Sequence, residues 1–380
     1  MGRVIRSILI TILLICFTIP LYGCWDYIDS KDISYVAGMS IDKKNNKYNL
    51  TYEIIKAGAD GKSASSEMIS SEGDTIHAAL RDVVKKSGTR LQLSHMKVII
   101  VSENIAGEGI GETLDLINRD VELRNDMWIL VAKSLAASDI LDALDSPDDI
   151  VSFNIDKALS KPSVIGKYVS SEIFTVIEGF KSPDKSVIIP LVQLKKGSEL
   201  NISGGGVFRG DKMVGTLSEE ELLMLNIIRK DKEADEFVIS VPVGDKGYVG
   251  VELMDIKRKF TPGIIDNKPT IDIDLHINLA VSEVESKDVN LNDSKCRDKL
   301  TKNIETYITE NIYSLMEQLQ QEYNSDVVGI GSKFKLSQNK ELQKIATDWD
   351  NQFKNLNINI NTRVNIRFTG LSNEVIGKGD

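Results

Sequence analysis

The run Ile271-Asp272-Ile273-Asp274-Leu275-His276-Ile277-Asn278-Leu279 decides the fold of the last third of the chain. Apolar and polar residues alternate along it, which is typical of a β-strand with one buried and one solvent-facing side. A similar alternating run covers residues 356–368, and residues 297–323 between the two runs carry an apolar stripe at helical spacing. We therefore expect residues 246–380 to form an α+β domain in which one sheet is packed by a long helix.

Upstream of this domain, strand patterns alternate with helix patterns. Residues 33–55 are expected to form a β-hairpin, and residues 75–86 a helix whose apolar residues share one face. Short apolar runs at residues 96–101 and 128–132 are typical of buried strands. This alternation predicts an N-terminal α/β domain over residues 24–195.

A small middle domain, residues 196–245, is expected between these two. Residues 202–217 read as a hairpin around a polar turn, and Ser218 with Glu221 forms a capping box that starts a helix. Further helices are expected over residues 164–180 and 341–353. The predicted fold class is thus α+β and multi-domain, with mixed β-sheets packed by helices.

The N-terminus has the pattern of a secretory signal. Arg3 and Arg6 supply positive charge, residues 8–19 are almost entirely apolar, and Pro20 ends the run. The apolar run is shorter than the ~20 residues that a permanent membrane-spanning helix needs. Residues 1–23 are therefore expected to be a signal peptide.

The residues after the apolar run resemble a lipobox, the cleavage site of bacterial lipoproteins. Leu21 lies three positions before Cys24, and the small Gly23 lies immediately before it, although Tyr22 stands where a small residue is usual. Cys24 would then carry lipid on its sulfur, with two acyl chains giving stable anchoring to a membrane. The alternatives are ordinary secretion with Cys24 incidental, or an uncleaved anchor.

Composition narrows the function classes. The formal net charge is −10, which argues against nucleic-acid binding and against electrostatic docking on anionic lipid. With Cys16 in the signal and Cys24 lipidated, Cys296 is left alone, so the mature chain has no internal disulfide. No base is identifiable that would make Cys296 a nucleophile.

Sequence motifs for catalysis or cofactor binding are missing. His77, His95 and His276 have no second ligand at zinc-site spacing, and neither a G-x-S-x-G elbow nor a P-loop is present. Asp326, beside the glycines of residues 328–331, is either a turn-forming residue or a ligand, and turns use aspartate more often. We expect no catalytic residue, no metal site and no cofactor.

The order of several segments resembles the Ger(x)C family, the lipoprotein C subunits of spore germinant receptors. The resemblance starts at the Cys-Trp-Asp of residues 24–26 and continues through a strand ending in Gly-x-x-x-Asp and a late Asp-x-x-Gly-x-Gly stretch. The segments that carry it are residues 23–26, 36–42, 93–100, 119–124, 206–215 and 323–331, followed by a helix holding Trp349.

This resemblance implies a non-enzymatic, three-domain protein tethered through a diacylglyceryl group on Cys24 to the outer face of the spore inner membrane. It implies two integral-membrane partners, the A and B subunits, and a role in nutrient-triggered germination. His95, Arg119, Asp120 and Arg124 are candidate partner contacts, and a structural network of ion pairs explains them equally well.

Two other functions remain open at this point. A solute-binding lipoprotein of a transporter would share the anchor, but should show two similar α/β lobes with parallel sheets. A surface hydrolase would need a nucleophile or paired carboxylates at strand ends, and the sequence offers none that is persuasive.

Overall fold

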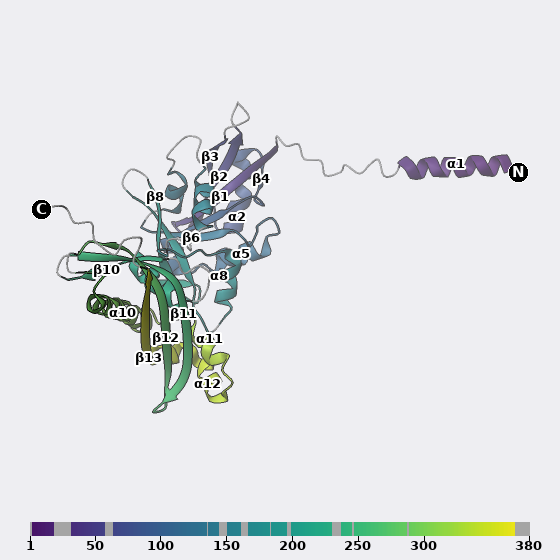
Figure 1. The fold of residues 1–380 in the computed structure, drawn as a ribbon. Helices are drawn as coiled ribbons and strands as arrows, with labels where there is room; N and C mark the ends of the chain where they lie inside the picture. The colour runs from purple at the N-terminus through teal and green to yellow at the C-terminus, as the bar shows by residue number, and fades with distance from the viewer. Residues whose placement is uncertain are drawn as a thin grey trace.

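The computed structural model shows two β-sheets with helices packed against them (Figure 1). It describes residues 2–18, 32–57, 64–134, 136–143, 150–160, 166–182, 184–195, 199–229, 237–244, 247–286 and 289–368. The predicted α+β class with mixed sheets is confirmed, because each sheet contains both parallel and antiparallel pairs.

The larger sheet has the strand order β3-β2-β1-β5-β6-β7-β8-β9, and β4 pairs with the start of β1. The expected hairpin of residues 33–55 is confirmed as the β1–β2 pair. The inner strands β5 and β6 are almost wholly buried, as expected for parallel strands covered on both faces. The strands are β1 Ile33–Lys44, β2 Lys47–Ala57, β3 Ala64–Gly73, β4 Arg90–Gln92, β5 Val98–Ser102, β6 Trp128–Ala132, β7 Ile188–Leu194, β8 Leu200–Arg209 and β9 Lys212–Leu217.

Helices cover both faces of this sheet with separate cores. One face carries α2 Ile76–Asp82, α4 Glu103–Glu108, α5 Gly111–Arg119 and α8 Ile173–Phe180, with the short α3 Val84–Ser87 after α2. The other face carries α6 Ala137–Leu141 and α7 Val151–Leu159.

The helix expected over residues 164–180 begins only at Ile173. Tyr168 and Glu172 instead form isolated bridges to Gly204 and Trp128. The prediction of helix before Ile173 is therefore wrong for residues 166–172, because these residues lie against strands of the larger sheet.

The residues assigned to a middle domain contribute to both parts of the molecule. β8 and β9 form the expected hairpin, and β8 also pairs antiparallel with β7, so the hairpin extends the larger sheet. The capping box at Ser218 is confirmed at the start of α9 Glu219–Ile228. The apolar side chains of α9 belong to the same core as the second sheet.

The second sheet has the order β10-β11-β12-β13, and α10 packs against it (Figure 1). The alternation at residues 271–279 is confirmed, since its apolar residues are buried within β12. Its elements are β10 Phe237–Val243, β11 Gly247–Ile265, β12 Lys268–Val284, α10 Ser294–Glu317 with a π-helical extension to Tyr323, α11 Ile330–Lys335, α12 Lys340–Ile345, α13 Trp349–Lys354 and β13 Asn357–Phe368. The helix expected over residues 341–353 is interrupted by a 3₁₀ turn at Ala346–Asp348.

Polar contacts join the two parts of the molecule. Asp184, just before β7, accepts hydrogen bonds from Lys335 Nζ at 2.8 Å and Ser332 Oγ at 2.6 Å, both on α11. Ser325 Oγ donates to the carbonyl of Phe208 in β8 at 2.8 Å. The acceptor Asp184 and the donor Ser325 are both buried, so these contacts hold the two sheets in one arrangement.

Candidate partner-binding surface

The candidate surface for binding partner proteins includes the start of β1. Its first residues, Ile33 to Tyr35, run parallel to β4. His95, in the turn after β4, packs its ring edge-on against Tyr35, with centroids 5.6 Å apart and planes at 66°. Cys24, upstream of Ile33, lies outside the described residues.

Arg119 and Asp120 lie at the C-terminal end of α5. Arg119 Nε donates to Asp115 Oδ2 one helical turn back, at 2.8 Å. Asp120 Oδ1 accepts from the backbone N–H of Glu122 at 2.9 Å and so shapes the loop that follows. Both contacts are local, and the exposed ion pair between Arg119 and Asp115 adds little to folding stability.

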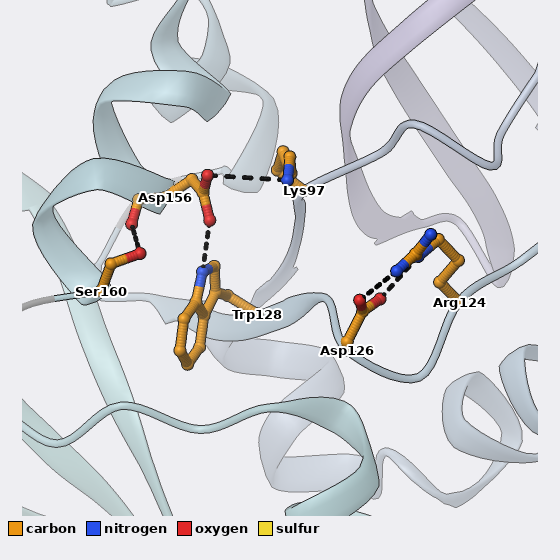
Figure 2. A network of polar contacts seen from close by, with 6 residues as sticks. All are labelled: Lys97, Arg124, Asp126, Trp128, Asp156 and Ser160. Carbon is orange, nitrogen blue, oxygen red and sulfur yellow. Dashed lines mark hydrogen bonds and ion pairs between the residues drawn. The ribbon is translucent and has the colours of Figure 1, made fainter.

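Arg124 pairs with Asp126 across the end of the same loop, through an Nε–Oδ1 hydrogen bond of 2.8 Å and a second contact from the guanidinium. The hydrogen bonds from Arg124 hold the pKa of Asp126 below its ordinary value. Figure 2 shows this pair beside Lys97, and Lys97 lies 3.8 Å from Asp156, which accepts from Trp128 Nε1 at 2.7 Å.

An ion pair between Arg90 of β4 and Glu122 connects this loop to the start of β1. The structure therefore links β4, which is followed by the turn holding His95, to the loop after α5, in which Asp120 and Arg124 lie. We call residues 119–126 together with Tyr35 and His95 the β1-start surface.

A cavity of about 570 Å³ between α2 and α5 adjoins this surface. Arg119 and Asp120 line it, whereas His95 and Arg124 do not. Sequence reasoning missed Val121, which also lines it and is 98% exposed. The available signal was an apolar residue between two acids, Asp120 and Glu122, inside the charged run 119–124.

The charges of this cavity are mixed. Arg81 and Arg119 lie with Glu112 and Asp115 along its wall. Glu112 also accepts a 2.5 Å hydrogen bond from Tyr48, and burial together with this carboxylate raises the pKa of Tyr48 to about 12. A wall with both signs of charge does not select a free anion or cation, and it suits a polar protein surface.

The Gly-x-x-x-Asp segment of β1 has a structural role. A Cβ on Gly38 would lie 1.9 Å from Ser152 Oγ, so glycine lets the first turn of α7 approach the strand. Asp42 accepts from the backbone N–H groups of Ala137 and Ser138 at 2.7 and 3.0 Å, which caps α6. Burial is the main reason that the pKa of Asp42 is raised.

The Asp-x-x-Gly-x-Gly segment is also structural. Asp326 is buried and accepts from the N–H groups of Gly329 and Gly331 at 2.8 Å each, and from Trp349 Nε1 at 2.9 Å. A Cβ on Gly331 would lie 2.4 Å from the carbonyl oxygen of Asp184. The turn-forming interpretation of Asp326 is therefore confirmed.

The described residues contain no cluster of three or more His, Cys, Asp or Glu side chains able to hold a metal ion. Cys296 is partly exposed in the first turn of α10. His276 lies mid-strand in β12, opposite Lys257 and Arg363 in register. Cys296 in α10 and His276 in β12 thus belong to no common metal site among the described residues.

Two family models match this chain. The spore germination protein N-terminal domain matches residues 26–194, and the spore germination B3/GerAC-like C-terminal region matches residues 203–370. Spore germination protein B3 of Bacillus subtilis (strain 168) is 25% identical, with 88% of this chain and 91% of the relative covered. Spore germination protein KC of the same organism is 23% identical, with 98% of each chain covered.

Among solved structures, the crystal structure of the GerBC protein superposes with a TM-score of 0.59. It is 20% identical, and the superposition covers 87% of this chain and 97% of GerBC. The fold is thus that of GerBC, a two-sheet α+β architecture. The chain belongs to the Ger(x)C family of spore germination proteins.

Proposed function

We propose that this chain is the lipid-anchored, non-enzymatic C subunit of a spore germinant receptor. It acts with integral-membrane A and B subunits in nutrient-triggered germination. The observation that carries the proposal is the match of both family regions, in order, over residues 26–194 and 203–370.

The anchor in this proposal is a diacylglyceryl group with a further acyl chain, such as palmitate, on Cys24 after removal of residues 1–23. The N-terminal helix α1, Gly2–Thr18, exposes Val4, Ile5, Ile8 and Leu9, which suits a signal that inserts into lipid. None of the described helices is both long and apolar enough to span a membrane. The folded part is held at the extracytoplasmic face of the spore inner membrane.

The length of the tether supports a role for the β1-start surface. Residues 25–32 separate Cys24 from Ile33, the first residue of β1. An extended chain gains at most ~3.3–3.6 Å per residue, so the start of β1 stays within about 30 Å of the lipidated cysteine. His95, Arg119, Asp120 and Arg124 are then within reach of membrane-embedded partners.

The solute-binding alternative fits the structure less well. Such a protein should show two similar lobes with parallel sheets, whereas the two sheets here differ in strand number, order and helix cover. Arg124 of the β1-start surface pairs with Asp126, and Arg119 and Glu122 pair with the neighbouring Asp115 and Arg90. Charges that are already paired suit a protein interface better than a reaction site.

The test compares wild-type protein with Cys24→Ala in the spore-forming host. The wild type is expected to start at Cys24, to carry a diacylglyceryl mass and to fractionate with membrane together with its A and B subunits. Cys24→Ala should keep its signal peptide and lose both the lipid and the partners. Cys296→Ala is the matched control and should behave as wild type. If Cys24→Ala is processed and located like the wild type, the anchor is disproved.

A further inference from the structure

A second cavity lies at the carboxyl ends of three parallel strands, β1, β5 and β6. Its volume is about 470 Å³, within the ~300–1,000 Å³ that is typical of small-molecule sites. Its walls are residues 42–44 at the end of β1, residues 102–104 where β5 passes into α4, and Ser134 and Ala136 after β6. The β1-start surface lies at the other end of β1, so the two sites are separate.

The course of the chain after each strand forms this crevice. After β5 the chain enters α4 and α5, which cover one face of the larger sheet. After β6 it enters α6 and α7, which cover the opposite face. In sheets with parallel strands, ligands bind outside the carboxyl ends of the strands, at the point where neighbouring connections leave in opposite directions. The gap between β5 and β6 is such a point.

Backbone donors fix the two carboxylates of the wall. Asp42 accepts from the N–H groups of Ala137 and Ser138 at the start of α6. Glu103 Oε2 accepts from the N–H of Ser134 at 2.8 Å, a contact that crosses from α4 to the segment after β6. The shape of the crevice is therefore set by the protein itself, before any ligand binds.

Other polar groups of the wall have no partner. Ser102 is only 6% exposed, and its Oγ has no hydrogen-bond partner among the described residues. A buried hydroxyl without a partner is costly, and such a group beside a cavity indicates that something else supplies the partner. In the described part of the chain, no hydrogen bond or ion pair is found for the exposed side chains of Lys44 and Asn104 either.

The charges of the wall cancel. It carries two acids, Asp42 and Glu103, and two bases, Lys43 and Lys44. Lys43 Nζ already pairs with Glu108 Oε2 at 2.6 Å. A ligand with a net charge would therefore gain little here, and the wall suits a neutral ligand with many polar groups.

We propose that this crevice binds a small neutral polyol of about the size of a monosaccharide. Hydroxyl groups both donate and accept, so they can donate to the remaining lone pairs of Asp42 and Glu103. The same hydroxyls can accept from Lys44, Asn104 and Ser102. A zwitterion fits less well, because its ammonium would meet carboxylates whose charge is already offset by backbone donors. This inference does not depend on the proposed receptor role, because it rests on the crevice alone.

The test uses the full-length chain in mild detergent, titrated with D-glucose, with D-sorbitol and, as a zwitterion, with glycine. Calorimetry and ligand-observed NMR measure binding, because polyols at high concentration stabilise proteins without occupying a site. The variants are Lys44→Gln, Asn104→Ala, Ser102→Ala and Lys344→Gln. Lys344 is an exposed residue of α12 outside the crevice, so its variant makes the same charge change elsewhere.

We expect saturable binding of at least one of the two polyols by the wild type and none of glycine. Lys44→Gln and Asn104→Ala should each weaken polyol binding about tenfold, because each removes donors to ligand hydroxyls. Ser102→Ala should weaken it about threefold, yet without polyol its Tm should equal or exceed that of the wild type, because the unpartnered hydroxyl is gone. Lys344→Gln should bind as the wild type does.

Three results would overturn the proposal. The first is the absence of saturable binding of both polyols by the wild type. The second is an equal loss of binding in Lys44→Gln and Lys344→Gln, which would mean that only overall charge matters. The third is saturable binding of glycine without binding of either polyol, which would make the ligand a zwitterion. Lys44 and Asn104 are exposed, so their variants are expected to fold.

Discussion

Glu53 is a charged residue with no exposed surface, and its carboxylate has a clear role. Its two oxygens accept from the backbone N–H groups of Val151 and Ser152 at 2.7 and 2.9 Å. These are the first residues of α7, so a strand residue of β2 caps a helix from a distant part of the chain. A buried charge is tolerated when such donors satisfy it.

Replacing Glu53 by Gln tests this cap. The amide keeps one acceptor but turns its NH₂ toward a backbone N–H, so we expect the free energy of unfolding to fall by about 2 kcal/mol. Glu67→Gln on the exposed face of β3 loses only its ion pair with Lys56 and should cost less than about 1 kcal/mol. Urea unfolding of both variants measures the difference, and equal losses would contradict a special role for Glu53.

Val121 provides the residue-level test of the β1-start surface. It is an exposed apolar side chain among charges, so Val121→Asp should leave the free energy of unfolding within about 0.5 kcal/mol of the wild type. If the surface meets membrane partners, co-purification of the A and B subunits from spore membranes should fall at least about fivefold. Leu336→Asp, at a similarly exposed site after α11, should retain the partners. Full retention by Val121→Asp would exclude this residue from the interface.

At the scale of elements, α10 protects the edge of the second sheet. β13 is an edge strand, and two of its backbone N–H groups donate to side chains of α10. Ile360 N–H donates to Tyr313 OH and Val364 N–H to Glu305 Oε1, each at 2.9 Å. An unprotected edge strand is a template for pairing with another chain, so the helix limits aggregation as well as covering the core.

Tyr313→Phe removes one of these edge contacts. We expect a loss of about 1 kcal/mol in the free energy of unfolding, because one hydrogen bond of average strength disappears. The amide of Ile360 should exchange with solvent faster, as measured by hydrogen exchange. Tyr248→Phe alters an exposed ring of β11 for which no hydroxyl hydrogen bond is found among the described residues, and it should change neither quantity. Unchanged exchange at Ile360 in Tyr313→Phe would refute the edge role.

At the scale of the whole molecule, Asp184 joins the two parts of the chain. Burial by itself would raise the pKa of this carboxyl, but hydrogen bonds from Lys335, Ser332 and Ser182 outweigh it and lower the pKa below 3.8. A carboxyl with a lowered pKa in the folded state adds stability above its unfolded pKa, and this stability is lost as the pH falls through the folded value.

Asp184→Asn should therefore be less stable than the wild type at pH 7, by about 2 kcal/mol. The gap should narrow as the pH falls below 4, because the unfolded wild-type chain takes up this proton first, and it should close once the pH is below the lowered pKa of the folded state. Urea unfolding across this pH range provides the measurement. Asp350→Asn, at an exposed site of α13, should show no such gap. A gap that stays constant with pH would mean that the ionised state of Asp184 contributes nothing.

The sequence by itself determined the local elements. The alternation of residues 271–279 and the apolar stripe of α10 each encode burial within one continuous segment, so periodicity is enough to find them. The capping box at Ser218 is a motif of four consecutive residues and is found by its spacing. The candidate residues Arg119 and Asp120 were also found from sequence, but not their shared cavity with Val121.

Only the tertiary structure decided how distant segments meet. The pairing of β1 with β5, the cap of α7 by Glu53 and the hydrogen bond from Lys335 to Asp184 join residues far apart in the chain. Such contacts depend on the free energy of the whole packed molecule, because the tertiary fold determines which group lies next to a strand edge or a buried charge. Local patterns do not contain that information, because the same residues could satisfy their hydrogen bonds in several arrangements.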